Sequence, residues 1–131
     1  MPDVQNSKIE RPLSPHLQIY KFPFTAVTSI LHRMTGVALA IGTLMVVWWL
    51  LAAATSEAAY DTAMAFAVSP VGKIMLFGWS LALYFHLCNG LRHLIWDTGR
   101  LFDKCAAKTA SYIVVLAAIV MTLGTWALAY M

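Results

Sequence analysis

The chain has 131 residues, of which 60% are hydrophobic and only 11% are charged. Soluble domains carry about a quarter charged residues, so this composition excludes an ordinary soluble domain and indicates a membrane protein. The net charge of +3 has the sign expected of topology-setting residues in a membrane protein, and it does not indicate nucleic-acid binding.

The first 24 residues are predicted to form an extended arm. They hold four of the five prolines, and proline opposes regular helix. The arm also contains too many apolar residues for a plain solvated tail, so we expect it to lie on the membrane surface or on a partner. A disordered tail is the alternative. The polar start of the chain has the features neither of a signal peptide nor of an organelle transit peptide.

Three segments lack Asp, Glu, Lys and Arg, namely 34–56, 74–91 and 109–131. A membrane-spanning helix needs about 20 apolar residues. We therefore predict an all-α membrane protein with one membrane-anchor domain, residues 1–131, and three transmembrane helices, at about 25–54, 69–98 and 109–131.

Local signals refine the first two helices. Gly36, Ala40 and Gly42 are small residues that let the first helix approach a neighbour closely. Ser69 is placed to cap the second helix, and Pro70 suits its first turn.

Basic residues predict how the helices are oriented. The segments before the first helix and between the second and third, the latter at 92–108, are rich in Lys and Arg, whereas 55–73 contains only Lys73. Because cytoplasmic loops carry the excess of Lys and Arg, we expect a cytoplasmic N-terminus and a C-terminus outside.

His86 is the most informative residue because it lies in the charge-free second segment. At 1.5 Å per residue it lies roughly 9 Å from Arg92 along the helix axis, so it is buried near the cytoplasmic side. An imidazole there can ligate iron, hydrogen-bond another helix or relay protons. Gly90, at i+4, leaves room on the same face for a flat ring, and His93, at i+7, would lie near a haem propionate. The alternative for His93 is an interfacial residue paired with Asp97.

Ser29 and Arg33 form a second candidate site at the inner end of the first helix. Their i, i+4 spacing places both on one helix face. A hydroxyl and a guanidinium at the membrane rim can bind quinone carbonyl oxygens and stabilise the negative charge that develops on reduction. The alternative is that Arg33 only sets topology and binds lipid headgroups.

Three motifs resemble the cytochrome b (C-type) membrane-anchor family of succinate dehydrogenase, respiratory complex II. They are RPLSPHL at 11–17, SILHRMTG at 29–36 and HLCNGLRHLIWD at 86–97. The resemblance covers nearly the whole chain, and it implies a role for several residues. His86 matches the axial ligand of haem b, and Ser29 and Arg33 match the ubiquinone site. His32, Arg33 and His93 match positions near the haem propionates, and Asp97 matches a position suspected in proton delivery.

The resemblance also implies partners. Haem b would be shared with a companion D-type anchor that supplies the second ligand, and ubiquinone would be reduced where both anchors meet the iron–sulfur subunit. The chain would dock that subunit and the flavoprotein subunit, without catalysing succinate oxidation itself. The bacterial inner membrane is expected rather than the mitochondrial one, since no transit peptide is seen. The alternatives are a fumarate reductase anchor and a cofactor-free structural membrane subunit.

Overall fold

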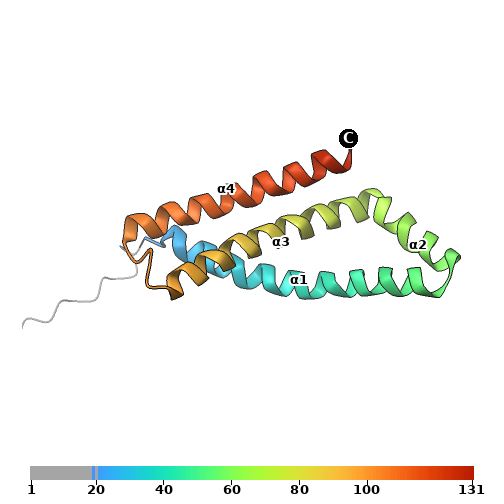
Figure 1. Ribbon diagram of the computed structural model, residues 1–131, viewed down its shortest axis with the longest axis horizontal. Coiled ribbons are helices and arrows are strands. Elements are labelled where there is room, and N and C mark those ends of the chain that lie inside the picture. Colours follow the sequence, from blue (N-terminus) through green and yellow to red (C-terminus); the bar gives the residue numbers. More distant parts are fainter. Residues whose placement is uncertain (1–18, 20) are drawn as a thin grey trace, which may run out of the picture.

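The computed structural model describes Ile19 and residues 21–131, and within them every regular element is an α-helix (Figure 1). The elements are α1 (Phe24–Thr55), α2 (Glu57–Val68), α3 (Pro70–Asp97) and α4 (Lys104–Ala129). The all-α prediction is confirmed. The predicted arm lies almost entirely outside the described residues.

Three of the four helices are long and apolar enough to cross a membrane, as predicted. They are α1, α3 and α4, with 32, 28 and 26 residues. At about 1.5 Å per residue, even the shortest exceeds the roughly 30 Å hydrocarbon core of a bilayer. The first helix begins at Phe24, just before the expected start, and the Ser69 side chain accepts a hydrogen bond from the Gly72 amide with Pro70 at the first helical position.

Two boundaries differ from the prediction because side-chain caps start helices outside the charge-free segments. The sequence predicts no helix between the first two spans, but Ser56 accepts a hydrogen bond from the Ala59 amide and starts α2. The last helix was expected from residue 109 but begins at Lys104, where Asp103 accepts from the amides of Cys105 and Ala106. These side chains satisfy amide hydrogens that a helix start leaves unpaired.

The bundle is apolar outside and partly polar inside. The buried apolar cluster consists of Phe85, Val114 and Ala118, between α3 and α4. Large apolar side chains such as Ile74, at 73% exposure, face outward on all three long helices. The buried polar residues are Thr28, Asn89, Arg92, Ser111 and Thr122. This distribution suits a lipid environment, where exposing apolar side chains to lipid carries no free-energy penalty. Polar groups are more stable there when they face other helices.

Glycine brings α1 and α3 close together, as the small residues of the first helix predicted. A Cβ atom added at Gly42 would lie 2.0 Å from Nε1 of Trp79, so the indole ring rests directly on the α1 backbone. A Cβ added at Gly36 would lie 3.2 Å from Cε1 of His86. Gly42 therefore leaves room for the Trp79 side chain, and Gly36 leaves room for the candidate ligand His86.

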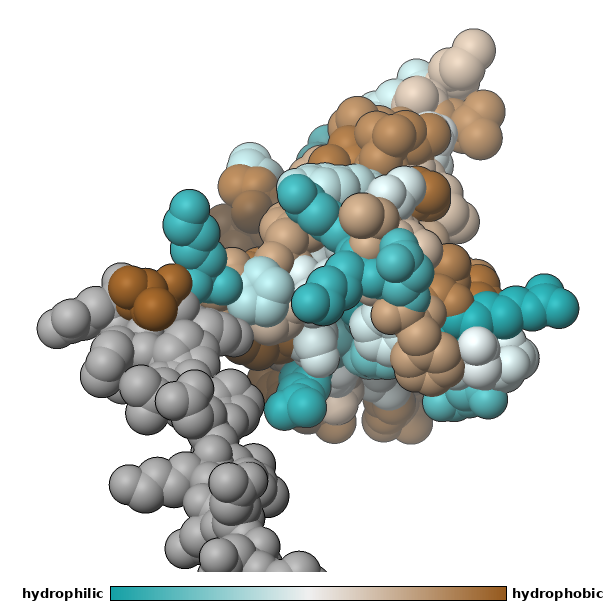
Figure 2. Space-filling model, turned by 90° about the vertical axis from the view of Figure 1, so that its left-hand side faces the viewer, coloured by the Kyte–Doolittle hydropathy of each residue, from teal (hydrophilic) through white to brown (hydrophobic). Residues whose placement is uncertain are grey.

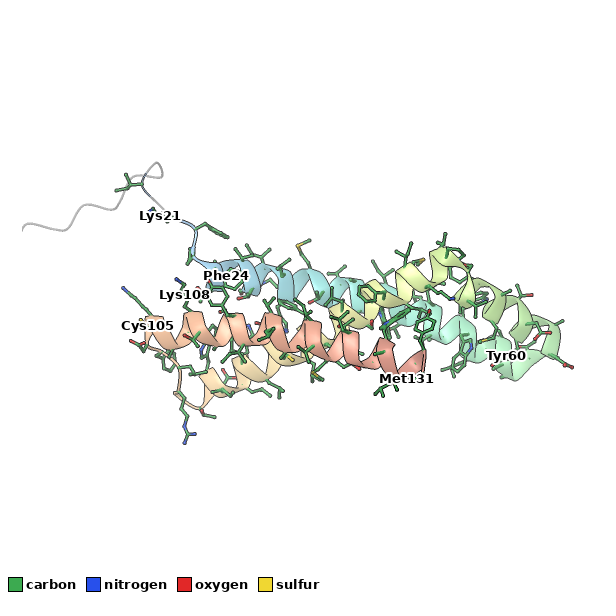
Figure 3. The ribbon with its side chains drawn as sticks, turned by 90° about the horizontal axis from the view of Figure 1, so that it is seen from above. Lys21, Phe24, Tyr60, Cys105, Lys108 and Met131 are labelled. Atoms are coloured by element: carbon green, nitrogen blue, oxygen red, sulfur yellow. The ribbon has the colours of Figure 1, made fainter. Side chains whose placement is uncertain are left out.

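One end of the bundle is formed by the start of α1, the 98–103 connection and the start of α4; we call it the basic end. Figure 2 shows hydrophilic side chains gathered there, and Figure 3 places Lys21, Cys105 and Lys108 at this end and Tyr60 at the opposite one. Gly99, with φ of +81°, reverses the chain after α3, a conformation that suits glycine. That the basic end faces the cytoplasm stays a prediction.

Candidate functional site

Three histidines from two helices meet between α1 and α3. The ring of His32, from α1, stacks on that of His86 with 4.0 Å between centroids and an interplanar angle of 17°. His93, about two turns nearer the basic end of α3, has its ring centroid 5.3 Å from that of His32 and contacts the Trp96 ring edge-on, with 5.0 Å between centroids. The structure thus brings together the three histidines that the sequence singled out within its helices.

The hydrogen bonds of His86 settle which ring nitrogen carries the hydrogen. Its Nδ1 lies 3.1 Å from the backbone oxygen of His32 and 3.2 Å from the hydroxyl oxygen of Thr35. A carbonyl oxygen only accepts, so Nδ1 is the donor. The Thr35 hydroxyl donates to the same carbonyl at 2.9 Å, which leaves its oxygen free to accept from Nδ1 as well.

The other ring nitrogen of His86 is left with its lone pair. Nε2 makes no hydrogen bond within the described part of the chain and is not among its fully buried polar atoms. An imidazole held through Nδ1–H and open at Nε2 has the arrangement of a metal-ligating histidine, whose second nitrogen usually donates to a carbonyl or carboxylate. The sequence did not predict that Thr35 and the His32 carbonyl are the hydrogen-bond partners of His86.

Gly90 has a different neighbour from the one that the sequence suggested. A Cβ added there would lie 3.8 Å from Nε2 of His32, which is ordinary contact. The glycine that closely contacts His86 is Gly36, from the other helix. The space at Gly90 therefore lies beside the His32 ring, whose Nε2 is buried without a partner among the described residues.

Ser29 and Arg33 lie beside this cluster rather than in it. Thr28, His32 and Thr35 line the face of α1 that contacts α3. Ser29 follows Thr28 and Arg33 follows His32. Each is therefore rotated by about 100° around the helix axis from the face that contacts α3. Ser29 is half-buried and Arg33 is exposed, so both are available to a ligand or partner outside this chain.

Arg92 and Asp97, both near the basic end of α3, lie in different environments. Arg92, which ends the charge-free second segment, is only 2% exposed and donates hydrogen bonds to Thr28 and Ser111. Asp97 is the exposed last residue of α3. His93 contacts the rings of His32 and Trp96, and within the described residues it forms no ion pair with Asp97.

The histidine cluster does not form a chelating set. Among the described residues, no group of three or more His, Cys, Asp or Glu side chains is arranged to hold a metal ion. The stacked rings of His32 and His86 explain this, because nitrogens of parallel rings do not converge on one point. An iron bound here would need a prosthetic group and a further ligand from elsewhere.

Comparison with known proteins identifies the family. The profile of the succinate dehydrogenase/fumarate reductase transmembrane subunit matches residues 7–125. The chain belongs to this family. It is 43% identical over 115 residues to the succinate dehydrogenase cytochrome b556 subunit of Paracoccus denitrificans, with 88% of each chain covered.

Further relatives carry similar names. The cytochrome b556 subunit of Rickettsia felis is 42% identical over 118 residues, covering 89% of this chain and 91% of the relative. The succinate dehydrogenase cytochrome b560 subunit of Reclinomonas americana is 34% identical over 128 residues, covering 92% and 88%. The family inferred from the three motifs is thus confirmed, and the similarity extends over nearly the full length of these relatives.

Proposed function

We propose that this chain is a haem b- and ubiquinone-binding membrane anchor of succinate:quinone oxidoreductase. The observation that carries the proposal is the hydrogen bond from His86 Nδ1 to the His32 carbonyl, which leaves Nε2 free as a ligand. The names of the relatives, which are cytochrome b subunits of succinate dehydrogenase, support the same assignment.

The residues present fit a haem shared between two chains. His86 would provide one axial ligand, and a companion D-type anchor would provide the other. The buried, unpartnered Nε2 of His32 supports a polar neighbour beside Gly90, and we assign His32, Arg33 and His93 to the neighbourhood of the haem propionates. When bound, haem accepts and releases single electrons; the chain's own contribution is to hold the Nδ1–H of His86 and fix its ring plane.

Ser29 and Arg33 are proposed to bind ubiquinone. The Ser29 hydroxyl and the Arg33 guanidinium can each donate a hydrogen bond to a quinone carbonyl oxygen, and the guanidinium stabilises the charge that develops there during reduction. Their outward position on α1 supports a site completed by the iron–sulfur subunit and the companion anchor. The basic end would then face the cytoplasm of a bacterium, where it would dock the iron–sulfur and flavoprotein subunits, while the helices cross the inner membrane.

The experiment that tests the haem assignment replaces His86 by Ala in the assembled complex. We expect the b-type absorption spectrum and the haem content to be lost or strongly reduced, with the protein subunits still present. The control is Cys88→Ala, two residues further along α3, where a half-buried thiol lies 4.0 Å from the Met121 sulfur. An unchanged spectrum in the His86 variant would contradict the assignment.

The family description also includes fumarate reductase, so the direction of turnover needs its own measurement. Rates of succinate-dependent quinone reduction and of quinol-dependent fumarate reduction, compared in the same preparation, separate the two. We expect the first to be the faster.

A further inference from the structure

The guanidinium of Arg92 connects three helices inside the bundle. Its Nη1 donates to the hydroxyl of Thr28 on α1, at 2.9 Å, and to that of Ser111 on α4. Its Cζ lies over the Trp96 ring, 4.6 Å from the centroid. Arg92 is 2% exposed, and Thr28 and Ser111 are fully buried. A cation is therefore enclosed between α1, α3 and α4, close to the basic end.

This cluster has more hydrogen-bonding capacity than its side chains use. Arg92 Nε and Nη2 are buried without a partner among the described residues, and so are both amide atoms of Asn89. Asn89 is fully buried and precedes Arg92 by three residues on the same face of α3. Three donor groups and one acceptor, on two side chains of one face of α3, are thus buried without a partner among the described residues.

The neighbouring hydroxyl groups do not supply the missing partners. The Thr28 hydroxyl donates to the backbone oxygen of Thr25 at 3.0 Å, and the Ser111 hydroxyl donates to that of Ala107 at 2.9 Å. Both hydroxyl oxygens already accept from Nη1 of Arg92. Within the described residues, no carboxylate pairs with the guanidinium. Buried polar groups in folded proteins are almost always paired, with water where protein atoms do not reach.

We propose that the buried, unpartnered polar atoms of Asn89 and Arg92 bind ordered internal water. The missing partners define the chemistry of the ligand, because the three nitrogen groups need an acceptor and Asn89 Oδ1 needs a donor. Water supplies both from one small molecule. A halide would serve the nitrogen donors but would be repelled by the Asn89 oxygen. Neither Asn89 nor Arg92 is among the residues proposed to hold haem, so the proposal does not depend on haem binding.

Bound water would explain how a charge is kept inside an apolar bundle without an acidic partner. It would complete the hydrogen bonds of the guanidinium while Nη1 holds Thr28 and Ser111. Thr28 directly precedes Ser29, so this contact also fixes the face of α1 that turns inward. Asn89 and Arg92 then act as one hydrated unit that joins the three long helices.

The direct test is a density map of the unmodified complex at a resolution that shows ordered water. We expect at least one water within hydrogen-bonding distance of both Asn89 and the Nε or Nη2 atom of Arg92. A direct hydrogen bond between the two side chains with no water density would overturn the proposal. So would an anomalous bromide signal at this position in crystals grown with bromide.

A double-mutant cycle tests the same site in solution. Asn89→Leu and Arg92→Met should each lower the unfolding temperature of the complex by several degrees. Each substitution leaves the buried polar atoms of the remaining residue with incomplete hydrogen bonding. The double variant should lower the unfolding temperature by clearly less than the sum of the two single decreases. Removing both side chains together leaves no buried polar atom of the pair without a partner. Additive losses would contradict the proposal.

Thr122→Val is the matched control for the cycle. Thr122 is equally buried on α4, but its hydroxyl already donates to the Ala118 carbonyl at 2.7 Å. Thr122→Val should change the unfolding temperature by the same amount whether residue 92 is Arg or Met. Coupling of similar size in this control would mean that the cycle reports general loosening of the bundle, and would also count against the water site.

Discussion

The Nδ1 atom of His86 lies 3.1 Å from the backbone oxygen of His32. This contact joins α3 to α1 through a main-chain acceptor, and it decides which imidazole nitrogen is free. The Thr35 hydroxyl, 3.2 Å from the same Nδ1, adds a second oxygen. The ring is thereby oriented by one helix while it belongs to another, so the geometry of the proposed ligand depends on how α1 and α3 pack.

Thr35→Val should alter the haem without removing it. The substitution keeps the volume but deletes the second acceptor of Nδ1–H, and the His32 carbonyl continues to hold the ring. A hydrogen bond of this kind contributes about 0.5–1.5 kcal/mol. Because hydrogen bonding at Nδ1 raises the basicity of the ligand, its loss should raise the haem midpoint potential. A redox titration of the complex measures this, and a lowered potential would contradict the proposed role of Thr35.

Gly42→Ala should weaken the packing of α1 on α3. The added Cβ would lie 2.0 Å from Nε1 of Trp79, so the indole ring must move. Overpacking of this kind typically costs about 1–3 kcal/mol. The check is the unfolding temperature of the purified complex. Gly78→Ala serves as the control because a Cβ there meets nothing within 4 Å; equal losses at both positions would refute the explanation.

Arg33→Leu should impair quinone reduction more than succinate oxidation by an artificial dye. The guanidinium is proposed to bind the quinone, whereas dye reduction needs only the partner subunits. Losing a charged hydrogen bond in a binding site costs about 1.5–3 kcal/mol, or roughly tenfold to a hundredfold in quinone turnover. Arg100→Leu removes the same charge from an exposed position at the basic end and should leave the ratio of the two rates unchanged. Equal loss of both activities in the Arg33 variant would indicate an assembly defect instead.

Asp103→Ala should destabilise the start of α4. The carboxylate accepts from the amides of Cys105 and Ala106 at 2.9 and 3.0 Å, and loss of such a cap costs about 1 kcal/mol. Asp103→Asn retains an acceptor oxygen and should recover most of the stability in thermal unfolding. If Asn were as harmful as Ala, the charge rather than the cap would be responsible.

Much of the architecture could be predicted because it depends on local composition. A segment without charged residues that is long enough to cross a bilayer partitions into it, whatever its neighbours are, so α1, α3 and α4 were found. The start of α3 was also visible, because Ser69 and Pro70 act on the backbone next to them. The sequence did not predict helix α2, although Ser56 is a residue type that caps helices as Ser69 does. Helix α2 is too short to cross a membrane, so the length of its apolar segment gives no indication of it.

The candidate site was only partly visible. The sequence by itself determined that His86 is an imidazole at membrane depth, because helix rise and the nearest charges set its position. Only the tertiary structure decided which oxygen holds its Nδ1, because a backbone carbonyl leaves no mark in the sequence. It likewise decided that Arg92 faces inward, since an arginine near the end of a span can reach the membrane surface or the bundle interior. Hydroxyl groups from two other helices, Thr28 and Ser111, make the interior position favourable, and their approach depends on the packing of the whole bundle.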